Sequence, residues 1–221
     1  MKREVALVSI FALAVAVMLF LFFSGNKESK PLRALPYFDP KDYSGVKKET
    51  HHVIPPFSLT NQYGKTTTQE VTNGKIYVVD CFFTTCQSIC PKMSNELVRV
   101  YAKFKNRNDF LILSHTVDPE TDTVAQMLNY AKQHGVNDEK WLFLTGNKKE
   151  LYALERKGYI LTLEEGDGGE DDFIHTQNFA LIDKEKHIRG FYDGTDSTEV
   201  NRLMADIQLL FDEYAYTEKS E

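Results

Sequence analysis

Hydrophobic side chains divide the chain into an apolar start, a polar stretch with three prolines and a long region of alternating patterns. Residues 5–23 carry no charge, and a helix of that length rises about 30 Å, which matches the hydrocarbon core of a bilayer. The pattern therefore predicts a transmembrane anchor within residues 1–25. Residues 22–26 offer no cleavage site of the Ala-x-Ala type, which favours an uncleaved anchor over a removed signal peptide.

Beyond the anchor, residues 26–45 contain the three prolines and no sustained helix or strand period, so we predict an extended tether there. Residues 46–216 have the length of one domain, and residues 217–221 form a tail. The segment before the anchor is very short and a large domain follows it. We therefore expect a cytoplasmic tip, a single-pass anchor in the inner (cytoplasmic) membrane, and a soluble domain on the periplasmic or extracytoplasmic side.

The first half of residues 46–216 alternates between strand and helix patterns. The predicted order is a hairpin at 56–68, a buried strand at 75–83, a helix at 91–105, a strand at 110–117, a helix capped by Thr121 or Asp122 and ending at Gly135, a strand at 141–144, and a helix from Asn147 to Gly158. Alternation of this kind is typical of parallel strands joined by helices.

The second half changes to strands before a closing helix. Strands are predicted at 159–163, 173–182 and 187–192, and a helix is predicted from Ser197. The last two strands form a hairpin through residues 183–186. Residues 164–172 hold six acidic residues and three glycines between the first two strands, and we predict a mobile hairpin tip there.

Two thiols, Cys86 and Cys90, lie four residues apart where the strand at 75–83 leads into a helix. Helical spacing brings both sulfurs to one face, close enough to share a metal ion or to form a disulfide. The N–H groups and dipole of a helix N-terminus lower the pKa of a thiol, and thiolate is the form that binds metals and attacks disulfides. A structural disulfide is the alternative, which the short loop disfavours because closing it removes little entropy from the unfolded chain.

A thiol pair after the first main strand, within this order of elements, predicts an α/β, thioredoxin-like fold with an N-terminal hairpin and an inserted β-hairpin, preceded by one transmembrane helix. In such sheets, binding sites gather at the carboxyl ends of the strands, where Cys86, Asp118 and the loop before Asn178 would lie. Cys81 lies inside the strand and is expected to pack as an apolar residue. The formal charge of −6 disfavours nucleic acid as a partner.

Three sequence blocks resemble the signature blocks of the Sco/SenC family. They are residues 83–91, residues 117–123, and residues 173–176 with the following 179–183 and 189–194. Members of that family are membrane-tethered, thioredoxin-fold proteins that deliver copper to the binuclear copper site of cytochrome c oxidase. Gln87 differs from the proline that usually follows the first cysteine of the family's motif.

The resemblance implies that Cys86, Cys90 and His175 bind copper, with Asp118 and Asp122 in an acidic block nearby. From its spacing alone, His175 would be an ordinary strand-end histidine. Two thiolates and one imidazole suit Cu(I) and can also hold Cu(II). The implied partner is the copper-binding subunit of cytochrome c oxidase, and three protein ligands leave an open position through which a recipient's cysteine could enter.

The same thiol pair could also reduce the recipient's cysteines, which would require a thiol reductant as a further partner. The alternative function is an extracytoplasmic thiol-disulfide oxidoreductase without stored metal. The Cys-x3-Cys spacing and the lack of a proline before Asn178 disfavour it, because thioredoxins have Cys-x2-Cys and a cis-proline there. A redox or copper sensor is a third function class, for which the sequence offers no dedicated element.

Overall fold

The computed structural model describes residues 15, 17–18, 34–40, 50–169 and 171–220. The chain divides into two compact units, one of residues 34–211 and one of residues 1–33 and 212–221. The predicted anchor lies outside the described residues, except for Val15, Val17 and Met18. No helix among the described residues is both long and apolar enough to cross a membrane.

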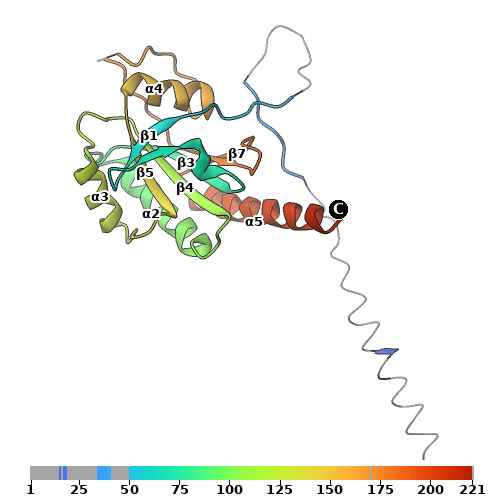
Figure 1. The fold of residues 1–221 in the computed structure, drawn as a ribbon. Helices are drawn as coiled ribbons and strands as arrows, with labels where there is room; N and C mark the ends of the chain where they lie inside the picture. Colours follow the sequence, from blue (N-terminus) through green and yellow to red (C-terminus); the bar gives the residue numbers. More distant parts are fainter. Residues whose placement is uncertain (1–14, 16, 19–33, 41–49, 170, 221) are drawn as a thin grey trace, which may run out of the picture. The chain divides into compact units, whose positions relative to one another are not determined.

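A mixed sheet runs through residues 34–211 (Figure 1). Its strands are β1 (Ser58–Asn61), β2 (Thr66–Thr68), β3 (Ile76–Phe82), β4 (Phe110–Thr116), β5 (Trp141–Thr145), β6 (Asn178–Ile182) and β7 (Ile188–Asp193). Their order across the sheet is β2-β1-β5-β4-β3-β6-β7. β3, β4 and β5 are parallel, and the antiparallel hairpins β1–β2 and β6–β7 lie on either side of them. The predicted α/β architecture with an N-terminal hairpin is confirmed.

Helices cover both faces of the sheet. They are η1 (Gln69–Thr72), α2 (Ile89–Phe104), α3 (Val124–Gln133), α4 (Lys148–Ala153), the π-helix η2 (Leu154–Gly158) and α5 (Ser197–Ser220). Every residue of β3 is buried, as expected for a strand with a layer on each side. Successive side chains of β3 point to opposite faces, so Phe82 stacks on Tyr130 of α3 while its neighbour Cys81 faces the layer of α4.

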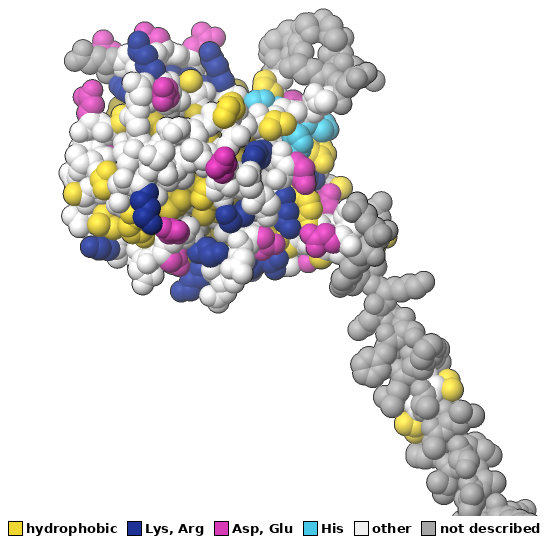
Figure 2. Space-filling model, in the orientation of Figure 1, with side chains coloured by type: hydrophobic (Ala, Val, Ile, Leu, Met, Phe, Trp, Pro, Cys, Tyr) yellow, Lys and Arg dark blue, Asp and Glu magenta, His cyan; other side chains and the backbone are white. Residues whose placement is uncertain are grey.

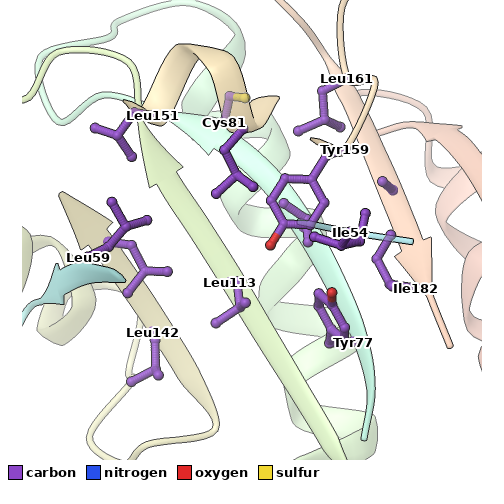
Figure 3. Packing of buried hydrophobic residues seen from close by; sticks show 14 of the residues in the cluster. Ile54, Leu59, Tyr77, Cys81, Leu113, Leu142, Leu151, Tyr159, Leu161 and Ile182 are labelled. Atoms are coloured by element: carbon purple, nitrogen blue, oxygen red, sulfur yellow. The ribbon is translucent and has the colours of Figure 1, made fainter. Parts of the chain in front are cut away.

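The layer of α4 and the sheet enclose an apolar cluster (Figure 3). Tyr77 and Cys81 from β3 meet Leu151 from α4 and Tyr159 from the segment after η2 in this cluster. Cys81 is only 4% exposed. The prediction that Cys81 packs as an apolar residue is therefore confirmed.

Neither predicted cap of α3, Thr121 or Asp122, is its N-cap. Thr123 is the N-cap, and its hydroxyl accepts a hydrogen bond from the Gln126 N–H at 3.3 Å. Asp122 does not cap this helix because its carboxylate already accepts hydrogen bonds from Thr84 and Thr116. A predicted cap that is confirmed is Asn147, whose side chain accepts from two N–H groups in the first turn of α4.

The strand predicted at 159–163 does not form, and β6 begins at Asn178 rather than at residue 173. The Leu161 N–H donates to the Glu155 carbonyl at 2.9 Å, while Ile160 takes a left-handed conformation with φ of +54°. Side chains of Thr176 and Asn178 donate to the Leu161 carbonyl, which a strand would have used for pairing. The backbone polar groups therefore follow a local network, and no hairpin encloses residues 164–172.

A bidentate ion pair connects the acidic run at 164–172 to the helical layer. Arg156 donates to both carboxylate oxygens of Asp172 at 2.7 Å, and it also donates to the Glu164 carbonyl. The Lys148 ammonium donates to the Gly169 carbonyl at 2.8 Å. These bonds hold Glu164, Gly169 and Asp172 next to α4 and η2.

Residues 34–40, within the predicted tether, pack against β7. Leu35 is 3% exposed, and the Phe38 N–H donates to the Ile188 carbonyl at 3.0 Å. The buried Arg189 guanidinium pairs with Asp183 and donates to the Leu35 carbonyl. The packed part of the chain therefore includes residues on the amino-terminal side of the predicted domain start.

Candidate metal centre

Cys86 and Cys90 lie on either side of the point where α2 begins. After β3, the Cys86 N–H donates to the Phe83 carbonyl at 3.2 Å, and α2 starts at Ile89. The Cys90 N–H donates to the Cys86 sulfur at 3.4 Å, and both thiols are free. The first amide groups of a helix lack carbonyl partners, so the Cys86 sulfur takes the place of a cap. The predicted position of the pair at a strand-to-helix junction is confirmed.

The pKa values of the two thiols are shifted in opposite directions. Burial raises the pKa of Cys86, but hydrogen bonds from the Cys90 thiol and from the N–H groups of Ser88 and Cys90 outweigh it and lower this pKa overall. Burial and the hydrogen bond donated to Cys86 raise the pKa of Cys90 to about 12. Cys86 is partly exposed and Cys90 is 4% exposed. Cys86 is therefore the accessible and more acidic thiol, whereas Cys90 is buried and stays protonated.

Hydrogen bonds to Asp122 connect the loop that carries Cys86 to the end of β4. This carboxylate is fully buried, and one oxygen accepts from the N–H and the hydroxyl of Thr84 at 3.0 and 2.5 Å. Its other oxygen accepts from the hydroxyl of Thr116, the last residue of β4. Asp122 thus positions Thr84, two residues before the first thiol.

Asp118 shapes the turn after β4. Its N–H donates to the Thr116 hydroxyl at 2.9 Å, and its carbonyl accepts from the N–H groups of Thr121 and Asp122. Its carboxylate accepts only a long bond of 3.4 Å from the Thr121 N–H among the hydrogen bonds described. Asp118 therefore supports the backbone that places Asp122.

His175 is exposed and lies just before β6. Its ring centre is 5.0 Å from that of Phe173, and the Phe173 ring in turn packs edge-on against Phe83, with 5.2 Å between centres. A cleft of about 680 Å³ includes both His175 and Ile89, the residue before Cys90, in its lining. The segment that carries His175 and the start of α2, which carries Cys90, therefore border one cleft.

The structure brings the two sulfurs together but does not gather a complete ligand set. Among the described residues, no three His, Cys, Asp or Glu side chains converge closely enough to hold a metal ion. The preformed part is the sulfur pair, whose donor chemistry fits a soft ion such as Cu(I). A third donor would have to come from a neighbouring segment such as the one that carries His175.

Asp80 is a buried carboxyl that the sequence analysis did not single out. It is 2% exposed on β3, accepts a hydrogen bond from Ser114, and has its pKa raised to about 7 by burial. Ser114 in turn accepts from the Trp141 ring N–H at 2.8 Å. Asp80 is the only acidic residue in the apolar run at 75–83. This break in the apolar pattern could have identified it as a buried carboxyl.

Two further buried polar side chains lie on the other face of the sheet. Glu155 of η2 is fully buried, and desolvation raises its pKa well above the ordinary value. Burial also lowers the pKa of His115 on β4 to about 3. Burial, and to a smaller extent the neighbouring Glu155, raises the pKa of Cys81 well above its ordinary value, so Cys81 is held as a thiol. This arrangement disfavours Cys81 as a third reactive thiol.

Comparisons with known proteins identify similar sequences. The model of the SCO1/SenC family matches residues 45–211. The "SCO1 protein homolog" of Bacillus subtilis is 29% identical over 165 residues, which cover 74% of this chain and 85% of that protein.

Solved structures are similar as well. BsSco, described as a member of the Sco family of cytochrome c oxidase assembly proteins with a disulfide switch, is 29% identical with a TM-score of 0.61, over 75% of this chain and 96% of that one. The copper-bound ScoI of Arabidopsis thaliana is 27% identical with a TM-score of 0.56, over 71% of this chain and 98% of that one.

Proposed function

Because this chain belongs to the SCO1/SenC family, we propose that it binds copper and delivers it to the binuclear copper site of cytochrome c oxidase during assembly. The observation that carries the proposal is the Cys86–Cys90 pair, in which the second residue's N–H donates to the first sulfur at the start of α2. A relative with the same fold was solved with copper bound, and another is described as an oxidase assembly protein.

In this proposal Cys86, Cys90 and His175 are the copper ligands. Copper, as the cargo, is held by soft sulfur donors together with one imidazole, a set that suits Cu(I) and can also hold Cu(II). The Cys90 thiol gives up its proton when the metal binds, because only thiolate coordinates. Binding would require His175 to move to the sulfurs across the cleft that its segment shares with Ile89.

Delivery follows from the incomplete ligand shell. Three protein ligands leave a position open, and a cysteine of the oxidase's copper-binding subunit enters there before Cys86 leaves. Copper then passes by ligand exchange without release into water. Cys86 is suited to leave first because it is the more exposed of the two thiols.

The proposed location follows from the sequence. A single-pass anchor within residues 1–25 holds the chain in the cytoplasmic membrane, with the domain on the periplasmic or extracytoplasmic side. Copper centres of the recipient subunit would then be reached from that side.

The unequal acidities of the thiols favour a second function, reduction of the recipient's disulfide. The Cys86 thiolate attacks one recipient sulfur and forms a mixed disulfide, and Cys90 then attacks Cys86. Two electrons pass to the recipient, which gains two thiols, and a Cys86–Cys90 disulfide remains. A thiol reductant partner returns that disulfide to the reduced pair.

Copper titration of the reduced full chain in detergent tests the proposal. We expect one Cu(I) per chain, bound strongly enough to compete with a chromophoric Cu(I) chelator, and a marked loss of affinity in His175→Ala. The matched control is His51→Ala, an exposed histidine bonded to Asp39. Unchanged affinity in His175→Ala would contradict the three-ligand site and favour the thiol reductase.

A further inference from the structure

Residues 160–163, here called the ridge, lie where two clefts meet. The first is the cleft of about 680 Å³ that includes Ile89 and His175. The second, of about 1050 Å³, is bordered by Arg156 and by the start of the acidic run. Ile160, Thr162 and Leu163 line both clefts, so a molecule that lies over the ridge would contact both.

Leu163 is the most exposed large hydrophobic side chain of the described residues, at 82%. One exposed leucine is ordinary on a protein surface, but this one lies in a cleft with Ile89, Ile160 and Phe191, which are only half-buried. The ridge therefore offers an apolar patch rather than a single side chain.

The backbone beneath this patch is held in place. Leu161 is fully buried, its N–H donates to Glu155, and its carbonyl accepts from Thr176 at 2.8 Å and from Asn178 at 3.1 Å. Leu163 is thus presented on a fixed segment two residues further along. A preorganised apolar side chain loses little entropy when a partner covers it.

The second cleft carries negative charge. Glu164, Glu165 and Asp167 are exposed on it, while Arg156 is paired with Asp172 and Lys157 is the remaining cation of its lining. Figure 2 shows acidic and basic side chains mixed over the α4 end of the molecule. The carboxylates next to the ridge outnumber Lys157, so they suit a basic partner.

We propose that this ridge is the docking surface for the copper-receiving protein. The contacting segment of that protein places an apolar side chain beside Leu163 and a Lys or Arg opposite Glu164 and Glu165. The inference rests on the proposed function: a cysteine on a segment docked here lies beside Ile89 and His175, next to the copper ligands.

Copper transfer from the full chain to the soluble domain of an oxidase copper-binding subunit tests this surface. The reduced, copper-loaded full chain in detergent is mixed with reduced recipient, and the transfer rate is followed against recipient concentration. Leu163→Ser should raise the half-saturating recipient concentration about tenfold, because the variant loses the leucine contact that docking buries. Val53→Ser, which removes another exposed apolar side chain outside both clefts, is the matched control.

A second experiment tests the acidic residues with two double variants that change the net charge by the same amount. Glu164→Gln with Glu165→Gln should slow transfer about tenfold at low salt and should flatten its salt dependence. Glu70→Gln with Glu139→Gln is the control, since both residues line a different cleft near the amino ends of β3 and β4. This control pair should transfer copper at the unaltered rate.

The outcomes separate this inference from the proposed function. If the unaltered chain binds copper but passes none to the recipient, delivery itself is wrong. If the unaltered chain delivers copper and the ridge variants match their controls, the docking surface is wrong while delivery stands. A fall in copper affinity of Leu163→Ser as large as the fall in transfer would also overturn the inference, because Leu163 would then act on the metal site.

Discussion

The Asp122 carboxylate accepts hydrogen bonds from both the N–H and the hydroxyl of Thr84, at 3.0 and 2.5 Å. These bonds cross from the turn after β4 to the loop after β3, two residues before Cys86. A buried carboxylate that gathers several donors stabilises the conformation of all the segments that supply them. The position of the first thiol therefore depends on a residue of the neighbouring βα connection.

Replacing Asp122 should loosen this connection. In Asp122→Ala, the donors of Thr84 and Thr116 lose their buried acceptor, and we expect a loss of about 2 to 4 kcal/mol in the free energy of unfolding. Asp118→Ala is the matched control, because that carboxylate accepts only a bond of 3.4 Å among those described and should cost under about 1 kcal/mol. Urea denaturation followed by the fluorescence of Trp141, the one tryptophan, measures both. Equal losses of unfolding free energy in the two variants would show that Asp122 does not stabilise this connection.

The acidity of Cys86 should depend on the thiol of Cys90. Hydrogen bonds, of which the largest comes from the Cys90 side chain, lower the pKa of Cys86, so iodoacetamide should modify it first and well below the pH needed for Cys90. Cys90→Ala should move the onset of Cys86 alkylation to higher pH, while Cys90→Ser, which keeps a donor, should move it less. Peptide mass spectrometry across a pH series gives both onsets. Identical onsets in the two variants would show that this hydrogen bond is unimportant.

The thiol site was largely predictable because its pattern is local. An apolar strand followed by Cys-x3-Cys and then Pro91 defines the strand-to-helix junction, and α2 begins within two residues of the predicted start. The buried strand, the N-terminal hairpin and the closing helix rest on similar short-range periodicity. Such patterns survive folding because burial on the matching face is their cause.

The region at 159–177 was not predictable because side chains far apart in the sequence decide its path. Thr176 and Asn178 occupy the Leu161 carbonyl, and Arg156 holds Asp172. An apolar run such as 159–163 satisfies a strand pattern equally well, and only these tertiary bonds remove it from the sheet. The same holds for Asp122, whose threonine partners could be identified only once β3 and β4 were placed side by side.

Asp80 should make stability depend on pH in a direction opposite to that of an ordinary carboxylate. Burial raises its pKa to about 7 in the folded chain, against about 3.9 when unfolded, so the folded state binds a proton that the unfolded state has lost. Its contribution to stability is full below about pH 4 and is lost as the pH rises to about 7.

Asp80→Asn should remove this loss. The difference in unfolding free energy between Asp80→Asn and the unaltered chain should shift by a few kcal/mol in favour of the variant between about pH 4 and pH 7, and should then level off. Urea denaturation followed by circular dichroism at several pH values measures it. Asp171→Asn, which changes an exposed carboxylate, is the control. A constant difference across this range would mean that Asp80 is ionised in the folded chain.

Copper binding should release the proton of Cys90 and therefore strengthen as the pH rises. Since the pKa of Cys90 is raised to about 12, its thiol is protonated throughout the neutral range, and one proton must leave for each copper ion bound. The apparent affinity of the unaltered chain should accordingly rise about tenfold more per pH unit than that of Cys90→Ser between about pH 6 and pH 8. Cys81→Ser should keep the unaltered slope, because Cys81 is buried in the apolar cluster and is not one of the proposed copper ligands. Competition titrations with a Cu(I) chelator of known pH behaviour give the three slopes. Equal slopes for the unaltered chain and Cys90→Ser would remove Cys90 from the ligand set, since a coordinating thiol of this acidity cannot bind without losing its proton.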